Sequence, residues 1–377
     1  VIAKEPVQAV AVVAPPKTEK PPPIKPAPVA PIKPMVIDTI KEVTPKSTII
    51  TSNKAPKFSD AYKDVSLSLK NGNSWESIKQ QLQAQSEAIQ ENPENVNAYL
   101  ARGNLKYQLQ DYRGAISDFN KVLEMDPKNA ETYNARGVAK TQLKNYKGAL
   151  EDFDKALKIN PRYANAYASR GIAQANMEDY SSALNDLDTA ISIAPDSGVF
   201  YSYRGTCKNN LSDYKGAIDA YDKALKINST DPLTYYNRGN TNVQLKDPFK
   251  AIEDYNKSIA LNSNYANVYY KRANAKADLQ DTRGALMDYD KAIQLDPENV
   301  KAYFNAGIMK NKLKDYDGAI VYYNKAIELD PTWSNAYYNR GIAKLAVGQI
   351  DNGCTDLSKA GELGYTQAYD AIRKNCN

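Results

Sequence analysis

Small, aromatic and polar residues recur along most of this chain with a period of 34 residues, starting at Val96. If Val96 is position 1, position 4 is Tyr in every period, position 8 is Gly or Ala, position 20 is Ala or Gly, and position 24 is Phe, Tyr or Leu. An Arg-Gly pair at positions 7 and 8 marks the register and first occurs as Arg102-Gly103. No period contains an insertion, so the pattern defines eight repeats: 96–129, 130–163, 164–197, 198–231, 232–265, 266–299, 300–333 and 334–367.

The spacing of these positions predicts two packed helices in each repeat. Small residues at positions 8, 20 and 27 let the helices approach closely, and aromatic residues at positions 4 and 24 fill the space between them. A larger side chain at Gly103 or Ala115 is therefore expected to cost roughly 1–3 kcal/mol through overpacking. We also expect an Asp or Asn to cap the second helix of every repeat, from Asp111 in the first to Asp351 in the last, by accepting its free N–H groups.

This pattern resembles the tetratricopeptide repeat family, whose unit is a helix–turn–helix of the same length. The resemblance covers residues 96–367, and the position 32 proline is kept in five of the eight repeats. Ser229, Ser263 and Tyr365 stand where the other three prolines are missing. The resemblance implies an all-α, right-handed superhelical solenoid that acts as a binding scaffold and not as an enzyme.

Both ends of the repeat array are expected to carry helical caps, because the terminal faces of a solenoid need polar covers. Residues 58–95 keep the second-helix features of a repeat as Ala88 and Pro93, and we interpret them as the N-terminal cap. Residues 368–377 are predicted to form the C-terminal capping helix.

Residues 1–57 differ in composition from the rest of the chain. They hold 12 of the 20 prolines and neither glycine nor aromatic residues, which predicts an extended Pro-rich tail or linker. Nine Lys and four acidic residues give this tail a charge of +5, so the remaining 320 residues are neutral. The chain begins at Val1 and not at Met, and we expect either a removed leader or anchor, or a fragment.

Charge and composition exclude several classes of function. A neutral body argues against nucleic-acid binding, which depends on neutralising phosphates. The chain has no histidine, so the usual general base and the commonest metal ligand are missing. We therefore expect no catalytic site, cofactor or metal. The longest apolar stretch, Ala9 to Ala14, is too short to span a membrane.

The repeated Arg at position 7 has two interpretations, a ladder of anion-binding groups or a structural ion pair. Asp stands at position 23 in six repeats, and the repeat with Ala306 in place of Arg has Tyr322 in place of Asp. The joint loss favours an ion pair between the two helices, with Arg204 opposite Ala220 as the exception. Such pairs contribute about 0–1 kcal/mol when exposed.

The resemblance implies that positions 2, 5, 9 and 12 line a concave groove. Position 5 is aromatic in the last four repeats but not in the first four, and Asn residues accompany it. Rings supply contact area, and Asn can bond both backbone groups of an extended peptide, so the C-terminal half is predicted to be the peptide platform. An ordinary repeat surface is the alternative. Position 5 is never Lys, so the grip on a C-terminal carboxylate known in some relatives is not expected. The predicted groove residues are Tyr236, Asn240, Tyr270, Asn274, Lys301, Phe304, Asn305 and Tyr338.

Three cysteines and one threonine complete the candidate chemistry. Cys207 occupies a helix-packing position and is expected to be a buried apolar residue. Cys354 and Cys376 could form a disulfide that holds the C-terminal cap, which would require an oxidising compartment. Asp38-Thr39-Ile40 resembles an O-glycosylation signal of bacterial surface proteins, which makes Thr39 a candidate for modification.

Two functions fit these features. The first is a non-enzymatic scaffold that binds a protein or extended peptide in its groove. The tail would then be an envelope spacer, and the location extracytoplasmic (periplasm or cell surface) in a bacterium. The second is a self-assembling filament subunit whose tail docks in the groove of another copy, since Pro-rich segments bind aromatic surfaces at low entropic cost.

Overall fold

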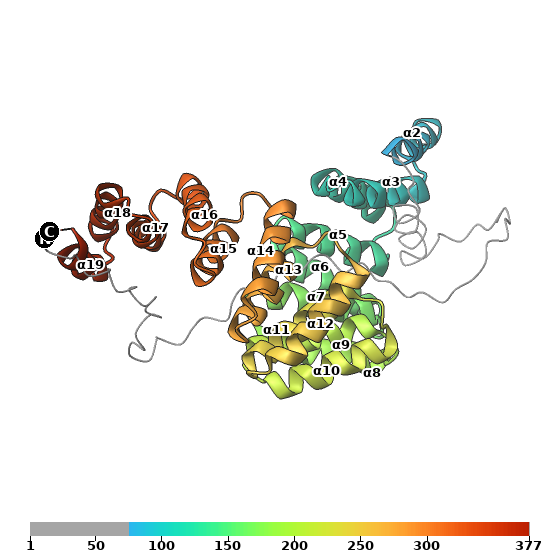
Figure 1. The fold of residues 1–377 in the computed structure, drawn as a ribbon. Coiled ribbons are helices and arrows are strands. Elements are labelled where there is room, and N and C mark those ends of the chain that lie inside the picture. The colour runs from blue at the N-terminus through green and yellow to red at the C-terminus, as the bar shows by residue number, and fades with distance from the viewer. Residues whose placement is uncertain (1–74, 377) are drawn as a thin grey trace, which may run out of the picture. The chain divides into compact units, whose positions relative to one another are not determined.

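The computed structural model describes residues 75–376, and this part of the chain consists of helices joined by short turns (Figure 1). The predicted tail, residues 58–74 of the predicted N-terminal cap and Thr39 lie outside the described residues. Two helices flank the repeats, α2 (Trp75–Glu91) and α19 (Gln367–Asn375). The described residues divide into two compact units, 75–229 and 230–376.

Each repeat contributes two helices, as its pattern predicts. The first helices are α3 (Val96–Gln108), α5 (Ala130–Gln142), α7 (Ala164–Asn176), α9 (Gly198–Asn210), α11 (Pro232–Gln244), α13 (Ala266–Asp278), α15 (Val300–Lys312) and α17 (Ser334–Ala346). The second helices are α4 (Tyr112–Met125), α6 (Tyr146–Ile159), α8 (Tyr180–Ile193), α10 (Tyr214–Ile227), α12 (Pro248–Leu261), α14 (Thr282–Leu295), α16 (Tyr316–Leu329) and α18 (Ile350–Glu362). Within each unit, every helix packs on the next one along the chain, which confirms the helical repeat architecture.

In six of the eight repeats the core is a ring at position 24 pressed against a small residue at position 8, and Leu187 and Leu357 replace the ring in the other two. A Cβ atom added at Gly103 would lie 2.7 Å from the Phe119 ring, and one added at Gly307 would lie 2.5 Å from the Tyr323 ring. Both rings are buried. The small residues are thus explained by the close approach of the first helix to the ring of the second.

The turn between the two helices of a repeat uses a left-handed residue at position 15. In the turn before α14, Gln280 has a φ of 64°, and the Asp281 N–H reaches back to the Lys276 carbonyl at 2.9 Å. This pattern ends a helix by satisfying its last carbonyl groups. Only the last of the eight turns places glycine there, Gly348 with a φ of 82°. The non-glycine residues, with φ between 59° and 66°, are Gln110, Lys144, Glu178, Ser212, Lys246, Gln280 and Lys314.

Most second helices begin with the predicted cap. Asp111 accepts from the Gly114 N–H at 2.9 Å, and Asp281 does the same for Gly284 at 2.9 Å. The expectation for Asp351 is wrong. The residue before α18 is Gln349, which makes no side-chain cap bond, and Asp351 lies inside the first turn of the helix.

The Arg of position 7 forms the predicted ion pair, but the setting is more buried than expected. In the repeat 266–299, Arg272 Nη2 lies 2.6 Å and Lys276 Nζ lies 2.7 Å from the carboxylate of Asp288, whose side chain is 6% exposed. Arg272 also donates to Asn256 of the preceding repeat at 2.6 Å. The expectation of a weak, exposed pair is therefore wrong, because the acid is enclosed between two helices. The equivalent pairs are Arg102–Asp118, Arg136–Asp152, Arg170–Asp186, Arg238–Asp254 and Arg340–Asp356.

Two repeats lack the Arg–Asp ion pair between their helices and keep only a polar contact with the preceding repeat. Arg204, with Ala220 opposite, pairs at 2.7 Å with Asp188 of the preceding repeat. Where Ala306 replaces Arg, the Tyr322 hydroxyl donates to Asp290 of the preceding repeat at 2.6 Å. Tyr322 thus takes over the bond between repeats that the missing guanidinium would make.

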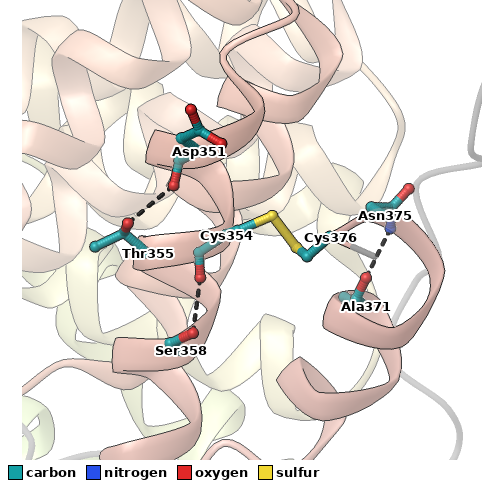
Figure 2. Close-up of a disulfide and its surroundings, with 7 residues drawn as sticks. All are labelled: Asp351, Cys354, Thr355, Ser358, Ala371, Asn375 and Cys376. Carbon is teal, nitrogen blue, oxygen red and sulfur yellow. Dashed lines mark hydrogen bonds between the residues drawn. A yellow bond between two sulfur atoms is a disulfide. The ribbon is translucent and has the colours of Figure 1, made fainter.

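The cysteines lie in two different environments. Cys207 is buried as expected, and burial raises the pKa of its thiol to about 12. Cys354 on α18 and Cys376 at the end of α19 are joined in a disulfide, with their Cα atoms 5.8 Å apart (Figure 2). The disulfide fastens the C-terminal helix to the last repeat.

Candidate functional site

Three of the four aromatic residues at position 5 rest on the buried rings of the second helices. Tyr236 lies 6.2 Å from Tyr255 between ring centroids, Tyr270 lies 5.9 Å from Tyr289, and Phe304 lies 5.9 Å from Tyr323. In these three repeats the first helix places its position 5 ring directly over the core of its own repeat.

A second ring covers three of these four residues. Tyr265 lies 5.2 Å from Tyr236, and Trp333 lies 4.7 Å from Phe304. Tyr265 and Trp333 are the residues before α13 and α17, and neither makes a side-chain cap bond there. These junctions have a stacked ring in place of a helix cap. Tyr365, before α19, covers Tyr338 in the same way at 4.7 Å.

Tyr270 is the exception, and the cause lies at the junction before α15. The residue there is Asn299, whose side chain caps the helix by accepting from the Ala302 N–H at 3.0 Å. A cap has replaced the ring, so among the described residues Tyr270 stacks only on Tyr289 beneath it. Its half-buried ring has no second ring from residues 75–376 over it.

The Asn residues around Tyr270 are held in defined orientations. The Tyr289 hydroxyl donates to Asn274 Oδ1 at 2.7 Å. Asn305 Nδ2 lies 3.4 Å from both Asn274 Oδ1 and the Tyr270 hydroxyl. These bonds occupy the carbonyl of Asn274 and the amino group of Asn305. A donor, Asn274 Nδ2, and an acceptor, Asn305 Oδ1, remain for the backbone of a bound peptide.

Two lysines flank this ring. Lys271 follows Tyr270 on α13 and is half-buried, whereas Lys301 on α15 is exposed. Burial lowers the pKa of Lys271, and the positive charge of Lys301 lowers it further. Within residues 75–376 neither lysine has an acidic partner, although Lys276 on the same helix is paired with Asp288. A desolvated cation without a counter-charge favours an anionic ligand. We call Tyr270, Lys271, Asn274, Lys301 and Asn305 the Tyr270 patch.

The structure brings four of the eight predicted groove residues into this patch: Tyr270, Asn274, Lys301 and Asn305. Tyr236 is 4% exposed and belongs to the interior, and Asn240 accepts from the Tyr255 hydroxyl at 2.8 Å in the same buried network. Phe304 lies beneath Trp333, and Tyr338, two repeats after Tyr270, lies against Tyr365. A second ring therefore covers Phe304 and Tyr338, whereas Tyr270 has none among the described residues.

The sequence pattern does not place Lys271 among the groove residues, although Asn305 occupies the same position 6 one repeat later. A signal for it exists in the sequence. Position 6 is Ala, Ser, Tyr or Asn in the other seven repeats and Lys only here. In the described residues no cluster of three or more acidic or cysteine side chains is arranged to hold a metal ion. The helices of this range are also too short or too polar to cross a membrane.

Family models identify the repeats. Two models described as tetratricopeptide repeat match residues 130–163 and 300–332, and residues 233–265 and 266–299. A third, described as TPR repeat, matches residues 103–144 and 210–246. No curated protein sequence matches the chain.

Solved structures share the fold. A chain of the APC/C hetero-tetramer Cut9–Hcn1 matches with a TM-score of 0.51 and 18% identity, over 77% of this chain and 57% of that one. Pseudomonas aeruginosa pilF matches with a TM-score of 0.50 and 22% identity, over 54% of this chain and 92% of that one. MamA is 29% identical over 44% of this chain and 96% of its own, with a TM-score of 0.42. The Cut9–Hcn1 and pilF matches show a common fold and nothing about ligands.

Proposed function

This chain is a tetratricopeptide repeat protein, and on that premise we propose that it is a non-enzymatic scaffold whose Tyr270 patch binds an acidic, extended segment of a partner protein. Helical repeats and their flanking helices account for the described residues. The fold itself suits protein–protein interaction, since stacked repeats form extended binding surfaces.

The observation that carries the proposal is Lys271. Its ammonium group is desolvated by burial and faces a second lysine, and no described acid compensates it. A carboxylate from a ligand would supply the missing charge at a partly desolvated site, where such a pair is stronger than in bulk water. Tyr270 offers a flat apolar surface beside it, and Asn274 and Asn305 offer one donor and one acceptor to a peptide backbone.

The tail of the chain is a poor ligand for this patch. Residues 1–57 carry a charge of +5, and the two lysines of the patch are also positive. Like charges repel, so we do not propose docking of the tail at Tyr270, and the filament hypothesis gains no support from this site.

The proposal is tested with a fluorescein-labelled decapeptide of Gly and Ser that carries a central Glu-Glu pair, the Glu probe, and a matched Gln-Gln peptide. We expect the Glu probe to bind at least about tenfold more tightly, a difference of roughly 1.4 kcal/mol. Lys271→Met should remove that preference. Lys257→Met, which changes an exposed lysine on α12, is the matched control. Equal binding of the two peptides by fluorescence anisotropy would contradict the proposal.

We also propose that the chain functions in an oxidising, extracytoplasmic compartment of a bacterium. The Cys354–Cys376 disulfide supports this, because disulfides rarely persist in a reducing cytosol. Alkylation of the protein in intact cells, followed by mass measurement, tests it. One modified thiol after denaturation, that of Cys207, is the expected result, and three would contradict the proposal.

A further inference from the structure

The last helix of the chain is short. α19 has nine residues and buries only Ala368 and Ala371 among them. Its Tyr369 ring lies against Gly361 of α18, where an added Cβ would be 2.9 Å from the ring, but Tyr369 itself remains half exposed. A helix of this length is marginal unless something holds it in place.

The disulfide is the bond that fastens α19 to α18. The polar side chains around the sulfur atoms bond within their own helices, as Figure 2 shows. Thr355 donates to the Asp351 carbonyl and Ser358 to the Cys354 carbonyl on α18, while Asn375 donates to the Ala371 carbonyl on α19. None of these bonds joins the two helices. Both sulfur-bearing residues are only half-buried, so a reductant can reach them.

The segment that leads into α19 touches the groove. Gly364 turns the chain with a φ of 91°, and the next residue, Tyr365, stacks on Tyr338 at 4.7 Å. Burial raises the pKa of Tyr338, and Tyr365 and Asp370 raise it further. Asp370 belongs to α19. Tyr338 of the predicted groove therefore contacts the segment before α19 through Tyr365 and interacts electrostatically with Asp370 of α19.

We propose that the Cys354–Cys376 disulfide is a redox latch that sets the order of the groove at Tyr338. With the latch closed, α19 keeps Tyr365 stacked on Tyr338. A dithiol reductant opens it: the S–S bond takes up two electrons and two protons to give two thiols, and the dithiol is oxidised to its own disulfide. α19 is then released and Tyr365 leaves the Tyr338 ring.

The test uses the full chain with and without dithiothreitol, and a Cys354→Ser variant. Hydrogen–deuterium exchange reports on the amides of residues 367–375, with the amides of residues 96–229 as an internal control. We expect reduction to accelerate exchange in α19 at least about tenfold and to accelerate nitration of Tyr338, mapped by mass spectrometry, about tenfold as its ring is uncovered. Cys354→Ser should show both effects without reductant. Tyr365→Ala, with the disulfide intact, should accelerate nitration of Tyr338 and leave exchange in α19 slow.

Each other outcome is decisive. Slow exchange in α19 after mass measurement has confirmed both thiols would show that the disulfide is no latch. Release of α19 with unchanged nitration of Tyr338 would show that the latch does not control this ring.

Discussion

At the scale of single residues, Asp288 and its equivalents combine burial with charge. Arg272 and Lys276 from the first helix converge on the nearly buried carboxylate of Asp288, as an Arg and a Lys do in three other repeats, and Arg272 stacks on the position 4 ring of Tyr269 at 5.5 Å. The invariant Tyr of position 4 therefore has an electrostatic role in addition to filling space. Pattern analysis found the pair from its joint loss in one repeat, but burial is a property of packed helices and could not be inferred from the pairing.

Replacing Asp288 by Ala is expected to lower the free energy of unfolding by about 3–5 kcal/mol, because Arg272 and Lys276 would be left partly buried without a counter-charge. Asp290→Ala is the control, since this exposed acid has a single bond to Tyr322, and its loss should cost no more than about 1 kcal/mol. Urea denaturation followed by circular dichroism measures both. Equal costs would mean that the buried pair is no stronger than a surface contact.

The thiol of Cys207 should be inert in the folded chain, because its pKa is raised to about 12 by burial. Reaction with a thiol reagent at pH 8 is expected only after unfolding. The raised pKa also stabilises the fold below about pH 8.5, where the unfolded thiol begins to ionise, and this contribution is lost as the pH rises toward 12. A Cys207→Ala variant should lack that alkaline loss of stability. Rapid labelling of the native, oxidised chain would contradict the prediction.

At the scale of helices, the sequence was sufficient for the repeats and their pairing. The period of the small and aromatic positions fixed where each helix pair lies, and Asp111 and Asp281 behave as the predicted caps. The patch was only partly predictable. Tyr236 and Tyr270 look alike in the pattern, and what separates them is whether the next junction carries a ring or a cap. That choice involves residues almost a full repeat apart in sequence, so position-by-position comparison did not reveal it.

The junction before α15 can be converted to the type found before α13. Asn299→Tyr is expected to cover the Tyr270 ring and to weaken the Glu probe about tenfold. Its stability should change little, since the lost cap costs about 1 kcal/mol and a new ring pair contributes about 0.5–1.5 kcal/mol. Asn299→Ala is the control, which loses the cap and leaves the ring uncovered. If both variants bind the probe like the parent chain, the exposure of Tyr270 does not determine recognition.

At the scale of the whole molecule, the repeats interact with their nearest neighbours, and each unit has its own stacked helices. Stability in such arrays is approximately a sum of repeat and interface terms. A fragment of residues 230–377 is therefore expected to fold alone and to bind the Glu probe with the affinity of the full chain, because it contains the entire Tyr270 patch. Far-UV circular dichroism and anisotropy measure this. A helical fragment that fails to bind would place part of the site elsewhere.

The left-handed turns are positions where substitution by glycine would raise the stability of this array. A residue with a side chain is strained in that conformation by roughly 1 kcal/mol, and seven of the eight turns accept the strain while Gly348 avoids it. Each of the seven is a separate place where glycine would strengthen one repeat, and such distant changes add nearly independently. Selection or an engineer can thus adjust the melting temperature in small steps, repeat by repeat, and leave the recognition surface unaltered.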